Sequence, residues 1–275
     1  MNYSNYYEIC KQQYEKEGKP PRDSEKEKEF YENPVREFDF MSSTDYREAV
    51  ESLSHKVKSD FDTNTDTLDD KIMLKHTNIW KFSEEIRNLC NVCVPKLESS
   101  MYFCNLYVDK IYIYRTNSLK DRESSYIWHY DNNPLEVVKT IIYLTDVDNE
   151  ENSPYEYLID SNNRGVIHPP TRTGPSHWLP APNNSRVNNI VEALNKTTKP
   201  ISNKVLGKKG TSCTFNNNAI HRANPLKKGF RDVINIRVKP TLIRPAHFAD
   251  PKWTTGFEIS GVVNPDPTLA WTSLV

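Results

Sequence analysis

The chain has 275 residues and a mass of 32.0 kDa, enough for one sizeable domain or for one domain with a smaller appendage. Its 36 lysines and arginines balance 37 aspartates and glutamates, so no net field favours a nucleic acid or an anionic membrane as partner. None of its 8 glycines lies between Gly18 and Gly165, and the glycine-rich loops that hold nucleotide phosphates occur nowhere in the sequence.

The apolar runs, the N-terminal segment and the cysteines indicate the cellular compartment. No apolar run approaches the roughly 20 residues of a membrane span, and residues 1–30 have no stretch typical of a signal peptide. The five cysteines are sparse and odd in number, so they predict no disulfide framework. These features predict a cytoplasmic protein without a membrane span.

The first hundred residues divide into two parts. Residues 1–40 are charged and poor in aliphatic side chains, and we expect a polar, solvated arm or exposed helix. Residues 41–100 form an expected helical flank, in which Ile79, Phe82, Ile86 and Leu89 recur at steps of three and four residues. A Cys-x-x-Cys pair, Cys90 and Cys93, has no second pair or suitably spaced histidine, which favours buried thiols over a zinc site.

The second part of the chain is rich in strands. Segments 101–114, 137–145, 211–220 and 231–239 carry aromatic and β-branched residues and are predicted strands. A Pro- and Asn-rich excursion over 160–210 is typical of a lid-like insertion. Its His168 and His177 either contact a substrate or are solvated loop histidines. Helices followed by strands predict a mainly β core with flanking N-terminal helices, a single domain over 41–275.

The most informative stretch is Tyr126–Asp131. If it is extended, His129 and Asp131 project from one face, which presents an imidazole and a carboxylate to one point. Such a pair is two thirds of the 2-His-1-carboxylate triad that binds non-haem Fe(II). A surface strand with two polar residues is the alternative at this point.

Two later segments add to this pair. His221 stands at the end of a predicted strand, and residues 231–238 place Arg231 and Arg237 on the face opposite Ile234 and Ile236. An arginine fork suits a carboxylate, which suggests an organic-acid cosubstrate. The two arginines lie about 20 Å apart along a strand, too far for one small carboxylate, and Arg231 is nearer the turn.

Together, the order His-x-Asp, a distant His and then Arg resembles the Fe(II)/2-oxoglutarate-dependent dioxygenases. The segments IHRANPLKKGFRDV and WHYDNNPLEVVKTIIYLTDV are most similar to the phytanoyl-CoA-hydroxylase-like branch, and the resemblance covers about residues 100–240. It implies a double-stranded β-helix (jelly-roll or cupin-like) core that holds iron at its open end. It further implies His129, Asp131 and His221 as metal ligands and Arg231 as the partner of the distal carboxylate of 2-oxoglutarate.

The resemblance also implies expectations for other positions, although less directly. Tyr112 and Tyr126 lie where related enzymes often contact 2-oxoglutarate, although both could equally be core tyrosines. Ala223 replaces the small hydroxyl residue often found two positions after the distal histidine, which removes one expected hydrogen bond to the cosubstrate. The related halogenases have Ala or Gly at the position of Asp131, so this carboxylate favours hydroxylation.

The resemblance therefore implies an enzyme that uses Fe(II), 2-oxoglutarate and O2. We expect it to hydroxylate an unactivated C–H bond of a small or carrier-bound metabolite and to release succinate and CO2. Two alternatives stay open: a nucleic-acid- or protein-modifying oxygenase of the same superfamily, and a non-catalytic β-helix binding protein. The balanced charge argues against nucleic acid, and neither the substrate nor the oligomeric state follows from the sequence.

Overall fold

The computed structural model describes residues 3–69, 73–118, 126–131, 133, 136–162, 164–167 and 199–257. The helices are α1 (Tyr3–Lys16), α2 (Ser24–Glu32), α3 (Thr44–Asp62) and α4 (Ser83–Leu97). The strands are β1 (Val35–Arg36), β2 (Thr67–Asp69), β3 (Met73–His76), β4 (Leu106–Asn117), β5 (Val138–Tyr143), β6 (Tyr155–Asp160), β7 (Pro200–Val205), β8 (Ser212–Asn216), β9 (His221–Ala223) and β10 (Phe230–Pro240).

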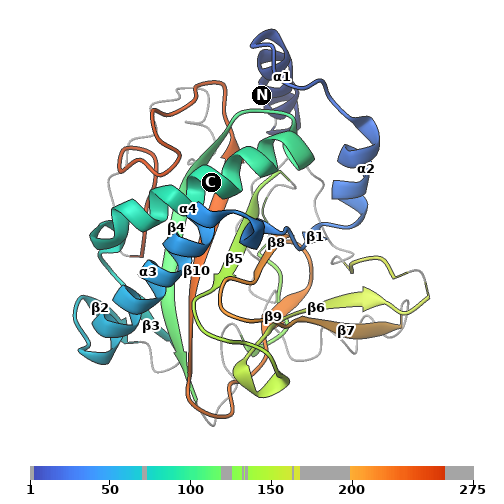
Figure 1. The fold of residues 1–275 in the computed structure, drawn as a ribbon. Helices are drawn as coiled ribbons and strands as arrows, with labels where there is room; N and C mark the ends of the chain where they lie inside the picture. The colour runs from blue at the N-terminus through green and yellow to red at the C-terminus, as the bar shows by residue number, and fades with distance from the viewer. Residues whose placement is uncertain are drawn as a thin grey trace.

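Two antiparallel sheets form the core (Figure 1). The larger has seven strands in the order β1-β8-β5-β10-β4-β3-β2, and the smaller has three in the order β7-β6-β9. An apolar cluster lies between them and includes Tyr143 and Val233 of the larger sheet and Tyr157 of the smaller. Two sheets that share one interior make the predicted mainly β, double-stranded β-helix core.

Strand β10 is the centre of the larger sheet and is buried on both faces. It pairs with β4 on one side and with β5 on the other, so that Asn235 lies opposite both Tyr112 and Ile141. Because side chains alternate along a strand, Ile234 and Ile236 face the helices while Val233 belongs to the interior cluster. The predicted division of β10 into an apolar and an arginine-bearing face is confirmed.

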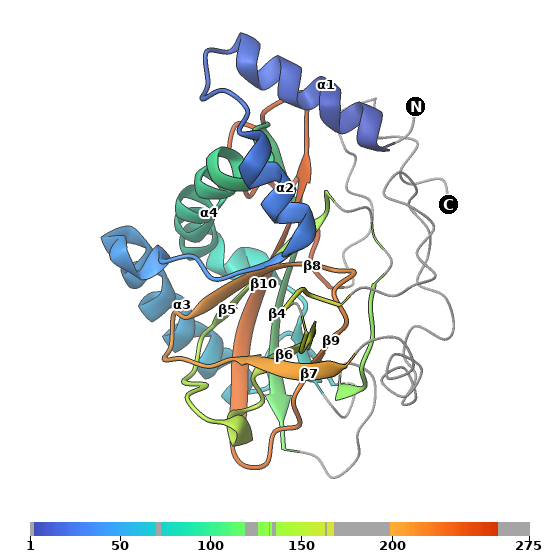
Figure 2. The same ribbon diagram turned by 90° about the vertical axis from the view of Figure 1, so that its right-hand side faces the viewer.

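Helices α3 and α4 cover the outer face of the larger sheet (Figure 2). The Ser43 hydroxyl accepts a hydrogen bond from the Tyr46 amide and begins α3. The apolar stripe predicted over residues 79–89 is confirmed, because Ile79, Ile86 and Leu89 are fully buried. Cys90 and Cys93 are buried free thiols of α4, as predicted, and burial raises the pKa of Cys90 to about 12.

The N-terminal segment differs from the solvated arm that its composition predicts. Helices α1 and α2 bury Tyr6, Tyr7 and Phe30 in the same core cluster as α3 and α4. The Tyr7 hydroxyl donates to the Tyr102 carbonyl oxygen at 2.8 Å, which ties α1 to the chain just before β4. A few aromatic side chains are therefore enough to dock two otherwise charged helices.

Several predicted boundaries are also corrected. Strand β4 begins at Leu106 instead of residue 101, because residues 98–102 form a turn of π-helix at the end of α4. The expected helical flank contains the short strands β2 and β3, which extend the larger sheet. Strand β7 occupies part of the expected excursion over 160–210, and the rest of that excursion, with His168 and His177, lies mostly outside the described residues.

Two glycines begin strands that lead to the site. Gly210 and Gly229 have φ values of 91° and 79°, a region that side-chain-bearing residues rarely adopt. Gly210 precedes β8, and Gly229 directly precedes β10. Among the described helices, none combines the length and the apolar character required to cross a lipid bilayer.

Candidate metal centre

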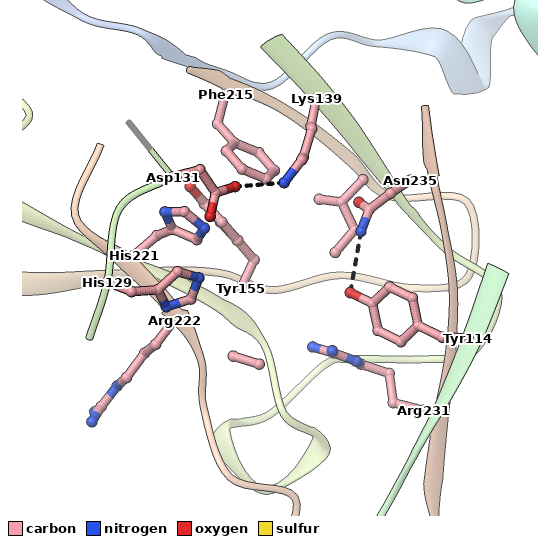
Figure 3. A pocket seen from close by; sticks show the side chains of 12 residues that line it. Tyr114, His129, Asp131, Lys139, Tyr155, Phe215, His221, Arg222, Arg231 and Asn235 are labelled. Carbon is pink, nitrogen blue, oxygen red and sulfur yellow. Dashed lines mark hydrogen bonds and ion pairs between the residues drawn. The ribbon is translucent and has the colours of Figure 1, made fainter. Parts of the chain in front are cut away.

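A cavity of about 110 Å³ opens between the two sheets (Figure 3). Its wall contains His129, Asp131 and His221 on one side and Arg231 of β10 on the other. All four are residues that the sequence predicts as site residues. The fold therefore brings together segments that lie about a hundred positions apart in the chain.

Backbone hydrogen bonds place the two histidines side by side. The His129 amide donates to the His221 carbonyl oxygen at 3.0 Å, and the His221 amide donates back at 2.9 Å. The Asp131 amide donates to the Asn217 carbonyl oxygen at 2.8 Å. The segment that holds His129 and Asp131 thus runs antiparallel beside β9. This agrees with the extended conformation considered for it from the sequence.

The side chains of these three residues converge on one point. One ligand atom from each of His129, Asp131 and His221 lies within 4.8 Å of the others, and the two imidazole centroids are 4.3 Å apart. Each histidine Nδ1 lies 2.7–2.8 Å from a backbone carbonyl oxygen, that of Ile127 or of Ala219. Since a carbonyl only accepts, Nδ1 carries a proton, and Nε2 is the atom through which each ring would bind a metal.

The charge of Asp131 suits the same role. Burial alone would raise the pKa of this carboxyl, but the neighbouring Lys139 ammonium holds the pKa well below its ordinary value. Lys139 Nζ lies 2.6 Å from Asp131 Oδ2, as the dashed line in Figure 3 shows. Two imidazoles and one ionised carboxylate form a donor set that fits Fe(II).

An arginine supports the two ligand segments from outside the metal centre. The Arg222 guanidinium lies over the Trp128 ring, 4.2 Å from its centroid, and Arg222 Nε donates to buried Glu156 Oε2 at 2.6 Å. Arg222 follows His221 and Trp128 precedes His129. The contact therefore joins β9 to the neighbouring segment next to both histidines.

The two arginines of β10 have different surroundings. Arg237 forms a bidentate ion pair with Asp109, with Nε 2.9 Å from Oδ1. Arg231 donates to the Ser153 carbonyl oxygen and, at 3.4 Å, to Thr116 Oγ1, while its Nε has no partner among the described residues. A buried guanidinium nitrogen without an acceptor is costly, and a bound carboxylate would supply that acceptor.

Several further cavity residues were missed at the sequence level, among them Tyr114, Tyr155 and Asn235. Asn235 Nδ2 donates to Tyr114 Oη at 3.2 Å (Figure 3). The buried Tyr155 hydroxyl has no partner among the described residues. The alternation of β4 and β10 is the signal that could have found Tyr114 and Asn235.

The two predicted tyrosines lie elsewhere. Tyr112 shares the inward face of β4 with Tyr114, but it packs against Phe257, with centroids 4.5 Å apart. Tyr126 is buried. Neither is among the residues that line the cavity, so their contact with a cosubstrate stays a prediction.

Solved structures share this arrangement of strands. HygX from Streptomyces hygroscopicus, with nickel, 2-oxoglutarate and hygromycin B bound, gives a TM-score of 0.52 at 14% identity over 81% of this chain and 89% of that chain. The epimerase SnoN, in complex with Fe3+, alpha ketoglutarate and nogalamycin RO, gives 0.53 at 12% identity over 78% and 83%. EctD from S. alaskensis, with bound Fe, gives 0.51 at 13% identity over 87% and 82%. This chain shares the fold of these three metal-binding proteins, two of which were solved with 2-oxoglutarate bound.

The likeness confirms the predicted double-stranded β-helix. The sequence itself matches no protein-family model and no curated protein. At 12–14% identity the neighbours share the fold with this chain, and SnoN shows that the fold serves reactions other than hydroxylation. What this chain does therefore has to be argued from its own residues.

Proposed function

We propose that the protein is an Fe(II)- and 2-oxoglutarate-dependent oxygenase that hydroxylates a C–H bond of a small or carrier-bound metabolite. The observation that carries this proposal is the convergence of His129, Asp131 and His221 within 4.8 Å, in one cavity with Arg231. A structural role would not require two imidazoles beside an ionised carboxylate, opposite a guanidinium whose Nε has no acceptor among the described residues.

Each residue has a distinct task in this proposal. His129, Asp131 and His221 hold the metal, and the carbonyl oxygens of Ile127 and Ala219 fix the orientation of the two imidazoles. Arg231 binds the distal carboxylate of 2-oxoglutarate. When bound, iron and 2-oxoglutarate supply the activation of O2, with release of succinate and CO2. The protein orients these groups and limits the access of water.

A binding experiment tests the metal and cosubstrate sites without a substrate. Anaerobic Fe(II) and 2-oxoglutarate added to the purified protein should give a weak visible metal-to-ligand band. His129→Ala should abolish the band, because one of three ligands is lost, whereas His55→Ala, an exposed histidine of α3, should retain it. The absence of a band in wild-type protein whose iron content is stoichiometric would overturn the proposal and favour a binding protein.

The reaction itself needs a substrate screen. Succinate formation is measured with sugars, amino acids, nucleotides and carrier-bound acids, and coupled turnover is separated from uncoupled turnover. Hydroxylation predicts a product that is heavier by one oxygen atom. A product of unchanged mass, formed together with succinate, would retain the cofactor assignment and reject the hydroxylase.

A further inference from the structure

Three cations lie side by side across the larger sheet. Arg237 of β10 is paired with Lys110 of β4 and with Lys139 of β5, so the three residues form one row across adjacent strands. Arg237 belongs to the face of β10 opposite Ile236, which packs under the helices, so the row lies on the inner face of the sheet, where Lys139 lines the cavity. Like charges directly opposite one another destabilise a sheet, so neighbouring anions would stabilise this row.

The described carboxylates do not balance the row. Asp109 pairs with Arg237 and also with Lys239, at 3.1 Å, and Asp131 pairs with Lys139. No carboxylate of the described residues lies within ion-pair distance of Lys110. Among the described carboxylates, therefore, Asp109 and the proposed metal ligand Asp131 serve the neighbouring cations, and none serves Lys110.

Burial makes this excess of positive charge costly. Arg237 and Lys239 are buried, and Lys110 and Lys139 are half-buried. Burial lowers the pKa of Lys110, and the neighbouring Arg237 lowers it further. Burial also lowers the pKa of Lys239. Both lysines would be stabilised in their charged form by an anion placed beside them.

The row lies apart from the proposed cosubstrate site. Arg231 and Arg237 stand near opposite ends of β10, about 20 Å apart in a regular strand. Lys139, by contrast, contacts Asp131 directly. An anion held by the row would thus lie on the metal side of the cavity, away from the carboxylate at Arg231.

We propose that Lys110, Arg237 and Lys139 form an anion-binding subsite for the substrate, which carries a carboxylate or a phosphate group. The occupant is a substrate if the proposed oxygenase function holds. The anion would contact Lys110 and Lys139, while Arg237 remains paired with Asp109 and adds to the positive potential. This assignment narrows the substrate class to acidic metabolites.

Calorimetric titration with small anions tests the subsite. Inorganic phosphate and, separately, acetate are titrated at constant ionic strength into nickel-loaded protein saturated with 2-oxoglutarate, so that the carboxylate site at Arg231 is filled. At least one anion should bind, and Lys110→Gln should weaken its binding roughly tenfold, the loss of one charge-assisted contact. Lys110→Arg should retain binding, and Lys96→Gln, an exposed lysine of α4, is the matched control.

The outcomes separate this inference from the proposed function. Phosphate binding that depends on Lys110 indicates a phosphorylated substrate, and acetate binding that depends on it indicates a carboxylate. If neither anion binds, or if Lys110→Gln and Lys96→Gln bind alike, the subsite is rejected. The titration is also repeated on metal-free protein without 2-oxoglutarate, so that its result does not depend on the proposed function. If anion binding depends on Lys110 but Fe(II) and 2-oxoglutarate give no visible band, only the oxygenase proposal is rejected.

Discussion

Arg237 and Asp109 form a bidentate ion pair in the interior of the larger sheet, with Nε 2.9 Å from Oδ1. Both side chains are buried, and the pair joins β10 to β4 at a β-bulge between Arg237 and Val238. This ion pair gives Arg237 a structural role. Arg231, six residues earlier on the same face, keeps one guanidinium nitrogen without a partner among the described residues.

This difference predicts opposite effects for two alanine variants. Arg231→Ala should raise the dissociation constant for 2-oxoglutarate roughly tenfold or more, because a charge-assisted contact with a carboxylate is lost. Arg237→Ala should change that constant little and lower the free energy of unfolding by about 3 kcal/mol, because Asp109 loses its main partner. Calorimetry of 2-oxoglutarate binding and urea unfolding measure the two effects.

Arg231→Lys is the control for this comparison, since it retains the charge without the planar fork and should bind 2-oxoglutarate with intermediate affinity. The reverse ranking, with weaker binding in Arg237→Ala, would assign the cosubstrate carboxylate to Arg237.

Part of this site was predictable because it depends on local patterns. The two-residue spacing of His129 and Asp131 puts both side chains on one face whatever the partner strand is. The alternation of β10 separates Arg231 and Arg237 from Ile234 and Ile236 without knowledge of the fold. A mainly β core with a helical flank followed because helices precede strands along the chain, whereas the double-stranded β-helix was implied by the resemblance to the dioxygenases.

Other features depend on pairing between distant segments. The row of Lys110, Arg237 and Lys139 requires the register of three strands, and the bulge at Arg237 shifts the register of β4 by one residue. Phe30 is one of two aromatic residues in the otherwise charged helix α2, and no local pattern shows that it packs against Tyr102. No sequence period encodes such contacts.

The N-terminal helices should contribute to stability. Phe30 is 1% exposed and lies 5.4 Å from the Tyr102 ring centroid. Phe30→Ala should therefore lower the free energy of unfolding by about 3 kcal/mol, the cost of a large cavity in a core. Lys28→Ala, an exposed position of the same helix, should change it by less than about 0.5 kcal/mol. Equal values in urea unfolding would mean that α2 is not part of the folded core.

The buried His76 predicts a pH dependence of stability. Its ring lies between Phe61 and Phe82, and burial lowers its pKa from 6.5, although Asp60, at 3.2 Å, opposes the shift. As the pH falls, the unfolded state therefore takes up the proton at a higher pH than the folded state does. The contribution of neutral His76 to the free energy of unfolding is thus complete above pH 6.5 and is lost as the pH falls below that value.

The thermal midpoint of the wild type should fall more between about pH 8 and about pH 5.5 than that of His76→Gln. His55→Gln, at an exposed position of α3, should behave like the wild type. A wild-type decrease that His76→Gln reproduces in full would assign the pH dependence to other groups.

Ala223 offers a gain of function at the cosubstrate site. It lines the cavity two residues after His221, where the resemblance to 2-oxoglutarate-dependent dioxygenases leads us to expect a hydroxyl. Ala223→Ser should tighten 2-oxoglutarate binding roughly threefold, the value of one ordinary hydrogen bond. Ala223→Cys adds a side chain of similar size with only a weak donor, so its affinity should stay near that of the wild type. If both variants bind more weakly in calorimetry, the alanine is required for space, and the cosubstrate lies closer to β9 than the proposed orientation toward Arg231 implies.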